Sequence, residues 1–478
     1  MDYLFWTIAG TLYGLIIGVM PMAGATTGLL TVFSLSDQFL ANPYLGIVFL
    51  VSLIASSSTG DSFTSILTGI PGSNTTAASI IDGYPLAQRG QAARAIGIAI
   101  MDSTINGILW GLVAFALMPF YSKIVLLFGM PEFAAFMIVA LATVGFITSR
   151  NIVLSLLAIG IGIFLGLVGQ NPATGIPRLT GGWDYLEAGI QIIPIIAGLF
   201  GIPEVLAGFT KKGHRPPPIV DYWPQLFQGF RDCVIHWRDM LRGGMIGFLT
   251  GLLPGIGGTI GDIMAYGATV AKHPNETFGN GNIKGLLGCE GANNAQKASS
   301  LIPTVLFGIP GAPFAAVMMA ICMYFGMELG TPQILQDNNF FWALGGAFIA
   351  STVLVFVFSM FTTKLIVRLL EIPYWIYATL ILAIITWSCL EYTGTINDIY
   401  ILILCSLLGI AAKHYHVSRP AIMVAFILSE KLEKYILHTM ELYQPAELLH
   451  RPLFVTLVIV AIVVFIYSAI KPRSMEYT

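Results

Sequence analysis

The sequence predicts an all-α polytopic membrane protein, with about 11 to 13 spans arranged as two repeats that contain broken helices and re-entrant hairpins. Three observations lead to this prediction. Of the 478 residues, 56% are hydrophobic and 10% are charged, whereas a soluble domain carries about 25% Asp, Glu, Lys and Arg. Apolar runs close to the roughly 20 residues of a spanning helix recur along the chain. Glycine and proline interrupt several of these runs, and broken backbone is tolerated in a bilayer only where it is buried in protein or lines a water-filled cavity.

The charge balance and the remaining composition exclude several other classes of protein. Lys and Arg number 23 and Asp and Glu number 25, so the formal net charge is −2. No basic face is available for nucleic acid, and the lipid bilayer is the expected surrounding. The five cysteines are scattered, which is typical of buried small side chains. The sequence has no P-loop, and no cofactor is predicted apart from a coupling ion, for which Na⁺ is one candidate.

The spans are predicted in order from the apolar runs. In the first half the runs are 2–20, 44–57, 95–118, 131–148, 152–168 and 190–209. In the second half they are 243–254, 308–325, 340–362, 372–387, 399–412, 421–428 and 453–470. The polar stretch 211–242 contains KKGHRPPP and six Lys or Arg residues, which favours the cytoplasmic surface. We therefore expect a first transmembrane repeat over 1–240, with a surface linker at 211–240, and a second repeat over 241–478.

An internal repeat supports this division. Residues 14–30 align without gaps on residues 247–263 with six identities, at an offset of 233. Residues 65–80 align on residues 304–319 with six identities, including the whole GIPG motif, at an offset of 239. Glycine-rich apolar sequence can match itself by chance, but two ordered matches at nearly one offset favour duplication. Duplicated halves with broken helices are the recurring plan of secondary transporters, which bind their substrate near the membrane midplane.

The loops that follow the two GIPG motifs differ in charge. The first loop carries Arg89 and Arg94, whereas the second carries Glu328 and Asp337 and no basic residue. Basic residues collect in cytoplasmic loops, so the two loops are expected on opposite sides of the membrane. This expectation favours an inverted repeat over a parallel one.

Four segments resemble a known family. They are IPGSNTTAASIIDGYPLAQRGQAARAIG, IIPIIAGLFGIPEVL, GLLPGIGGTIGDIMAYG and EGANNAQKASSLIPTVLFGIPGAPFAAV. With them the chain resembles, over nearly its whole length, the large membrane subunit of the tripartite tricarboxylate transporters. The resemblance implies a multi-pass permease of the bacterial inner membrane that imports carboxylates such as citrate by symport with an ion. It also implies two partners, a small four-helix membrane subunit and a periplasmic substrate-binding protein. The family's first Pro-Gly motif is Pro21 and Met22 here.

The glycine and proline motifs are candidates for the substrate site. A helix start offers free N–H groups and about half a positive charge to a carboxylate, and proline, serine and threonine favour such a start. The predicted substrate-binding residues are Gly24, Thr26, Thr27, Pro71, Gly72, Ser73, Asn74, Thr75, Gly257, Gly258, Thr259, Pro310, Gly311 and Ala312. The alternative interpretation is that these breaks are kinks that allow close helix packing.

A polar segment before the second GIPG motif is a further candidate. Asn293 and Asn294 follow Glu290, and two amides beside a carboxylate suit a substrate carboxylate or a cation. The alternative is a polar cytoplasmic loop, because Lys284 and Lys297 flank the segment. We predict that Asn293 and Asn294 belong to the substrate site. The motif cores contain no Lys or Arg, so a cation bound beside the substrate is expected to supply the missing positive charge.

Acidic residues in apolar stretches are candidates for ion coupling, since intramembrane carboxylates serve protons or Na⁺ in many transporters. We predict Asp61 and Asp262 as coupling-ion residues, with Asp82 and Asp102 as further acids of this kind. Two other functions stay open. Asp61 and Asp262 each follow a glycine, which would suit an intramembrane diaspartyl protease, in which two carboxylates share a proton. A channel is the third possibility. We predict a transporter and not an enzyme.

Overall fold

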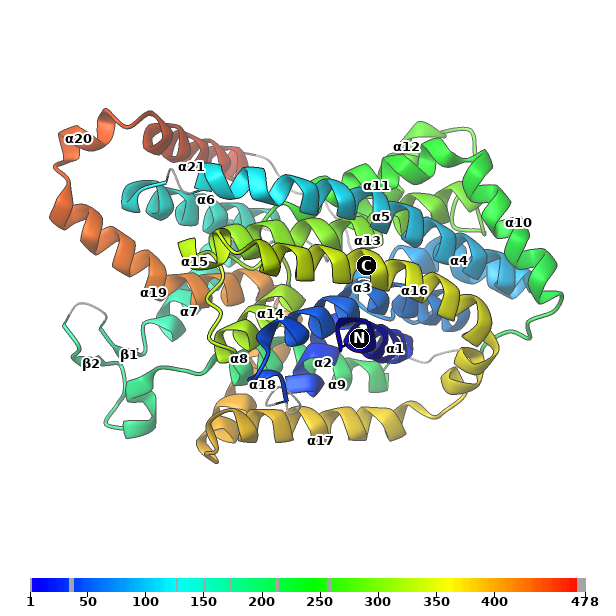
Figure 1. The fold of residues 1–478 in the computed structure, drawn as a ribbon, viewed down its shortest axis with the longest axis horizontal. Helices are drawn as coiled ribbons and strands as arrows, with labels where there is room; N and C mark the ends of the chain where they lie inside the picture. The colour runs from blue at the N-terminus through cyan, green and yellow to red at the C-terminus, as the bar shows by residue number, and fades with distance from the viewer. Residues whose placement is uncertain are drawn as a thin grey trace.

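The computed structural model describes residues 2–33, 38–125, 128–148, 152–171, 174–210, 215–255 and 260–470 of the chain (Figure 1). The helices of the first half are α1 (Asp2–Val19), α2 (Gly24–Val32), α3 (Pro43–Thr68), η2 (Asn74–Thr76), α4 (Ser79–Leu86), η3 (Ala87–Gln91), α5 (Ala92–Val125), α6 (Met130–Thr148), α7 (Ile152–Gly166), η4 (Asp184–Ala188), α8 (Ile192–Ile196), η5 (Ala197–Gly201), α9 (Ile202–Thr210) and α10 (Tyr222–Ile235). Those of the second half are α11 (Trp237–Gly251), α12 (Gly261–Lys272), α13 (Ile283–Phe307), α14 (Pro313–Tyr324), α15 (Pro332–Leu335), α16 (Asn338–Leu370), α17 (Tyr374–Thr393), α18 (Asn397–His414), α19 (Arg419–Leu442), α20 (Pro445–Leu449) and α21 (Pro452–Ile470). Strands β1 (Gly169–Gln170) and β2 (Pro177–Arg178) form an antiparallel pair, the only sheet in these ranges.

This architecture confirms the predicted all-α polytopic membrane fold. Seven described helical segments have at least 18 residues and are apolar enough to cross a membrane. Four further apolar helices, among them α7 and α14, have 10–17 residues, which is fewer than the roughly 20 that a complete crossing needs. Helix α13 has 25 residues, nearly all of them buried, and many are polar. Its length is sufficient to cross a bilayer at about 1.5 Å per residue.

Two helix pairs pack through glycine at equivalent positions of the two halves. A Cβ atom placed on Gly14 of α1 would lie 2.4 Å from the carbonyl oxygen of Leu53 on α3. A Cβ atom on Gly247 of α11 would likewise lie 2.4 Å from the carbonyl oxygen of Ala292 on α13. Only glycine lets the two backbones approach so closely. The same contact recurs one turn before and after, at Gly10 with Phe49, Gly18 with Ser57, Gly243 with Gly288 and Gly251 with Gln296.

The predicted helix breaks are present at all four motifs. Gly69 directly follows α3 and Gly308 directly follows α13, and these glycines have left-handed backbones with φ of 71° and 62°. Residues with a side chain adopt that conformation only with strain, so glycine stops each helix. At the other two motifs, α1 ends just before Pro21 and α11 ends just before Pro254. A proline there cannot continue the hydrogen-bonding pattern of the preceding helix.

The longest helix of each half packs against the other half. Helix α16 of the second half packs on α3 of the first, and α5 of the first half packs on α13 of the second. Hydrogen bonds fix α16 to the first half: Ser351 of α16 donates to the carbonyl of Ser52 on α3 at 2.9 Å, and Thr11 of α1 donates to the hydroxyl of Ser351 at 2.8 Å. Helix α2 also packs against α14. The breaks of one half therefore lie beside those of the other, and much of the buried core is shared between the halves.

The segment expected as a surface linker is largely helical. Helix α10 packs along α5, where Arg94 forms an ion pair with Asp232 at 2.6 Å. Residues 211–214 lie outside the described part, and residues 215–220 have no regular secondary structure. The expected boundary between residues 240 and 241 falls inside α11, which begins at Trp237. The linker is thus an amphipathic helix fixed to the core, with the proline-rich run before it.

Two further groups of helices flank this core. Helices α6, α7, α19 and α21 pack together at one end of the molecule (Figure 1). Segments α8, η5 and α9 pack with α17 and α18. The segment η5 is a π-helical turn, and such wide turns occur often at functional sites.

Candidate functional site

A pocket lies where the broken helices of the two halves meet. Its lining comes from the break between α1 and α2, the tip after α3, the π-helical turn η5 with α9, and α13 with the start of α14. The lining residues are Met22, Ala23, Gly24, Ala25, Thr26, Thr27, Ser73, Thr75, Phe200, Glu204, Lys297, Pro313 and Phe314. Both GIPG segments therefore lead into one pocket. The polar residue Thr75 and the apolar residue Phe314 hold equivalent positions at an offset of 239, so the two tips differ in chemistry.

The structure brings five predicted substrate-binding residues to this pocket, namely Gly24, Thr26, Thr27, Ser73 and Thr75. The turns of the two tips are formed by Pro71, Gly72, Pro310, Gly311 and Ala312. In these turns the amide of Gly72 donates to the Ser65 hydroxyl at 3.1 Å, and the amide of Gly311 donates to the Thr304 hydroxyl at 3.0 Å. The side chain of Asn74 and the residues Gly257, Gly258 and Thr259 lie outside the described part of the chain.

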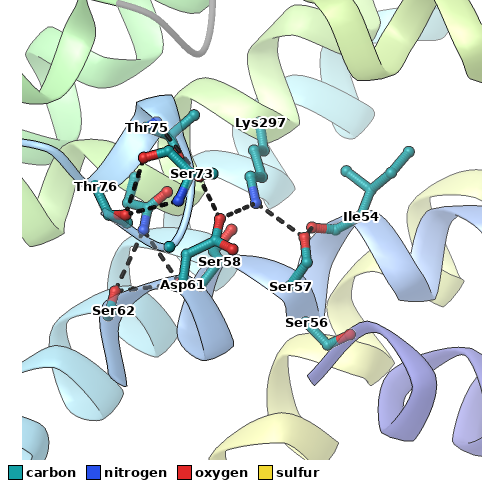
Figure 2. A network of polar contacts seen from close by, with 12 residues as sticks. Ile54, Ser56, Ser57, Ser58, Asp61, Ser62, Ser73, Thr75, Thr76 and Lys297 are labelled. Atoms are coloured by element: carbon teal, nitrogen blue, oxygen red, sulfur yellow. Dashed lines mark hydrogen bonds and ion pairs between the residues drawn. The ribbon is translucent and has the colours of Figure 1, made fainter. Parts of the chain in front are cut away.

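A buried ion pair joins the two halves beside the pocket. The ammonium nitrogen of Lys297 on α13 lies 3.6 Å from Oδ2 of Asp61 on α3. The same ammonium donates to the hydroxyl of Ser57 at 3.0 Å. The side chains of Lys297 and Asp61 are 1% and 0% exposed, and Figure 2 shows the Asp61 carboxylate between Lys297 and the tip after α3. Because the pair is shielded from water, each charge depends strongly on the other.

Ser73 connects this ion pair to the tip. Its hydroxyl donates to Oδ2 of Asp61 at 2.6 Å and accepts from the amide of Thr75 at 3.3 Å. The hydroxyl of Thr75 lies 2.8 Å from that of Ser73. Since the Ser73 proton is used on Asp61, Thr75 is the donor in that contact. Ser73 also caps the short helix η2, with Thr76 completing a capping box. Hydroxyl groups and the start of a helix therefore face the pocket from this tip.

Lys297 is a site residue that the sequence analysis does not identify. Helix α13 runs without interruption through residues 290–297, so the alternative of a cytoplasmic loop at this segment is wrong. The motif cores themselves contain no Lys or Arg, but Lys297 from α13 lines the pocket, so a positive charge of the protein is present beside them. Helical periodicity is the signal that could have found it. Glu290, Asn293 and Lys297 are spaced by three and four residues, which places them on one face of a helix.

The amides of Asn293 and Asn294 fasten α13 to its neighbours. Asn293 Nδ2 donates to the carbonyl of Ser58 on α3 at 3.3 Å, and Asn294 Nδ2 donates to the carbonyl of Ser103 on α5 at 3.1 Å. Both residues are buried, and neither is part of the pocket lining given above. In this conformation their hydrogen bonds hold helices together.

The two predicted coupling acids have different surroundings. Asp61 pairs with Lys297, whereas Asp262 lies in the first turn of α12 and accepts the amide of Ala78 from the other half at 3.0 Å. Among the described residues the two carboxyl groups form no hydrogen bond with each other. Oδ2 of Asp61 contacts Ser73 and Lys297, Oδ2 of Asp262 accepts the amide of Ala78, and the Oδ1 atom of each has no partner. The shared proton of a diaspartyl protease therefore has no support in this geometry. Asp82 caps the loop before α13, where it accepts two backbone amides.

A second set of charges lies on another wall of the pocket. Glu204 pairs with Arg419 at 2.6 Å and with Lys413 at 3.0 Å. Arg419 also donates to the carbonyl of Leu199 in the π-helical turn at 3.2 Å and lies over the ring of Phe200. The pocket thus combines acid–base pairs, hydroxyl groups and aromatic rings. Such a mixture of polar and apolar groups is typical of pockets that bind small molecules.

Comparison with known proteins agrees with these features. Residues 4–424 match the tripartite tricarboxylate transporter TctA family. An uncharacterized 52.8 kDa protein in the TAR-I ttuC' 3'region of Agrobacterium vitis is 28% identical over 440 residues, which are 91% of this chain and 86% of that protein. An uncharacterized protein in the TAR-II ttuC' 3'region of the same organism is 28% identical over 196 residues, 41% of this chain and 81% of that protein. No solved structure matches the chain significantly. This multi-pass membrane protein therefore belongs to the tripartite tricarboxylate transporter TctA family.

Proposed function

We propose that the chain is the permease of a tripartite carboxylate importer in a bacterial inner membrane. A periplasmic binding protein delivers a tricarboxylate or a related organic acid, a small four-helix membrane subunit completes the permease, and Na⁺ or H⁺ drives uptake. Family membership supports a transporter subunit. The observation that carries the substrate class is the buried cation of Lys297 in the pocket wall.

Lys297 already holds a carboxylate in this structure, that of Asp61. A substrate carboxylate in the pocket offers the same group to the same partners, the ammonium of Lys297 and the hydroxyl of Ser73. The substrate can therefore replace Asp61 while Lys297 stays paired. Such an exchange avoids an unpaired buried ammonium, which would be costly in this low-dielectric surrounding.

The exchange leaves Asp61 without its partner, and a coupling ion compensates for that loss. A proton or a Na⁺ at Asp61 neutralises the carboxylate once the substrate has taken Lys297. Binding of the substrate and of the ion then favour each other reciprocally, as symport requires. We assign Asp262 a second coupling role, because its Oδ1 atom is buried and has no partner among the described residues.

We also propose that residues 1–240 and 241–478 are, in outline, inverted repeats related by a pseudo-two-fold axis in the membrane plane. The matching glycine contacts of α1 with α3 and of α11 with α13 support duplication. The segment after the first GIPG motif is helical, with Arg89 in η3 and Arg94 in α5. Its basic residues, against the acidic Glu328 and Asp337 after the second motif, support inversion. The start of α11 at Trp237 favours a boundary near His236.

Uptake by proteoliposomes tests the proposal. The permease is reconstituted with its small subunit and supplied with the binding protein and labelled citrate or other di- and tricarboxylates, under an imposed Na⁺ or H⁺ gradient. Lys297→Gln should lower uptake by about tenfold or more, the loss expected for one charge-assisted hydrogen bond. Lys364→Gln, which changes an exposed lysine of α16, is the matched control. Wild-type uptake by Lys297→Gln would exclude Lys297 as the substrate's partner.

Counterflow separates a carrier from a channel. Vesicles loaded with unlabelled substrate should accumulate labelled substrate transiently. Unlabelled substrate bound on the inner side returns the binding site of a carrier to the outer side, where the site then takes up labelled substrate. The pocket between paired, broken helices favours this outcome. Equilibration without any transient accumulation would instead indicate a channel.

A further inference from the structure

Glu290 is a buried carboxylate that has no positive partner among the described residues. It lies about two turns before Lys297 on α13, and its side chain is 0% exposed. Lys297 is engaged with Asp61, and no ion pair of the described residues includes Glu290. The charged groups that act on Glu290 from neighbouring helices are themselves acids, Asp61 on α3, Asp102 on α5 and Asp262 on α12. This part of the core therefore lacks positive charge.

Ser62 and Asn293 lie next to this carboxylate. The hydroxyl of Ser62 is 2.7 Å from Oε2 of Glu290 and 3.1 Å from the carbonyl oxygen of Ser58. Asn293 directs Nδ2 toward the same carbonyl oxygen and toward the Ser62 hydroxyl, at 3.3 and 3.4 Å. The atoms Oδ1 of Asn293 and Oε1 of Glu290 are buried and accept no hydrogen bond from any described residue. Ser62 and Asn293 are 0% and 1% exposed.

The hydroxyl of Ser79 on α4 also interacts with the Glu290 carboxylate and lies 3.7 Å from the sulfur of Cys289. Even with this proton, the hydrogen atoms of the group leave the amide oxygen of Asn293 without a donor. Ser62 has one hydroxyl proton but two acceptors within reach, Oε2 of Glu290 and the carbonyl oxygen of Ser58. Asn293 directs its Nδ2 hydrogens toward the Ser58 carbonyl and the Ser62 hydroxyl. A proton added to Glu290 would satisfy one carboxyl oxygen but would leave the amide oxygen of Asn293 unpaired. A bound cation would satisfy several oxygens together. Buried acceptors are almost always satisfied in native proteins, so the surplus points to a missing ligand.

We propose that Glu290, Ser62 and Asn293, together with the carbonyl oxygen of Ser58, bind one Na⁺ between α3 and α13. Carboxylate, amide, hydroxyl and main-chain carbonyl oxygens are ligands that hard cations prefer. One carboxylate in the group matches the charge of one monovalent ion, whereas a divalent ion would leave an excess positive charge in a buried place.

The site would hold a Na⁺ in addition to the ion that neutralises Asp61, and this role in transport rests on the proposed function. Ser62 follows Asp61 directly in α3, and Glu290 shares α13 with Lys297. An ion that joins Ser62 to Glu290 therefore fixes the two helices that hold the pocket's ion pair. Occupancy of the Na⁺ site should raise substrate affinity, and the substrate should raise Na⁺ affinity by the same factor.

Thermal unfolding of the purified chain in detergent tests the site without any transport. The chain is heated in NaCl and in choline chloride at equal ionic strength and constant pH, with no substrate. Na⁺ should raise the Tm of the wild type by several degrees, since a ligand that binds only the folded state stabilises it. Glu290→Gln and Ser62→Ala should lose this rise. Ser359→Ala, which removes a buried hydroxyl of α16 that has no hydrogen-bond partner among the described residues, should keep it.

One further result separates a binding site from a merely structural carboxylate. In choline chloride, Glu290→Gln should be at least as stable as the wild type, because the substitution removes an uncompensated buried charge. Asn293→Ala provides a second variant if Glu290→Gln does not fold, and it should weaken the response to Na⁺ by about tenfold in the concentration required. A Na⁺ response retained in Glu290→Gln, or stabilisation that follows pH and not Na⁺, would overturn the site. A normal Na⁺ response without carboxylate uptake would instead count against the proposed function.

Discussion

Ser65 and Thr304 hold equivalent positions in the two halves, and each hydroxyl accepts the amide of the glycine seven residues later in the chain. The two halves also match in the hydrogen bonds between each tip and the break that follows the first helix of its half. Met22 donates its amide to the carbonyl of Pro71 at 3.2 Å, and Gly255 donates to the carbonyl of Pro310 at 3.0 Å. The departure from the family's Pro-Gly pattern at Met22 therefore leaves this contact in place, although Met22 adopts a left-handed φ of 65°.

Removing either hydroxyl should destabilise its own tip. Ser65→Ala and Thr304→Ala each leave a buried glycine amide without an acceptor, at a cost of about 1–3 kcal/mol. Ser65→Thr and Thr304→Ser exchange the residues of the two halves and should be nearly neutral. Thermal unfolding in detergent measures all four variants. Equal stability of the alanine and exchange variants would show that these hydroxyls do not hold the tips.

The glycine contacts between helices predict a second set of stabilities. Gly247→Ala places a Cβ atom 2.4 Å from the backbone of Ala292, so α11 must move away from α13 and lose packing. Gly346→Ala on α16 meets nothing within 4 Å and should stabilise the helix, by up to about 1 kcal/mol. The first variant should unfold at a clearly lower temperature than the second. If both substitutions lower the Tm equally, helix propensity and not close approach determines these positions.

The ion pair between the halves predicts a strong coupling energy. Lys297→Met or Asp61→Asn alone leaves one buried charge unpaired or poorly solvated, which should cost about 3–5 kcal/mol. The double variant removes both charges and should recover much of that loss. A double-mutant cycle of unfolding free energies gives the coupling directly. Additive losses would mean that the two side chains are independent in the folded protein.

Access to the pocket can be measured with cysteine labelling. All five native cysteines are buried, so a small polar thiol reagent should find little background. Thr26→Cys should react, and saturating citrate should slow its reaction. Asn339→Cys, at an exposed position at the start of α16, should react at a rate that citrate does not change. Labelling of Thr26→Cys that is indifferent to every carboxylate tested would place the substrate elsewhere.

The helix breaks could be predicted from the sequence because their causes are local. A left-handed glycine at Gly69 or Gly308 stops a helix whatever surrounds it, and proline after α1 acts through its own missing amide. Thr26 and Ser73, which the glycine and proline motifs predict as substrate-binding residues, both line one pocket. These residues lie at the breaks, and the breaks of a duplicated fold meet where the halves meet.

The charged part of the site could not be predicted in the same way. A lysine within a run of small residues is usually exposed to water, and only the packing of α13 among α3, α5 and α11 buries Lys297 and Glu290. The positions of Asn293 and Asn294 depend on that packing as well. Their amides bind main-chain carbonyls of other helices, partners that lie about 190 to 235 residues away in the sequence.

The packing of the long helix α16 of the second half on α3 of the first has a consequence for biosynthesis. The contact between Ser52 and Ser351 spans 299 residues, which a ribosome adding about 5–20 residues per second needs some 15–60 s to complete. During that interval the hydroxyl-rich face of α3 has emerged, but the helix that covers it has not. The nascent first half therefore has this polar face of α3 not yet covered by α16. Premature release at this stage would favour degradation, so the order of synthesis makes the first half the vulnerable one.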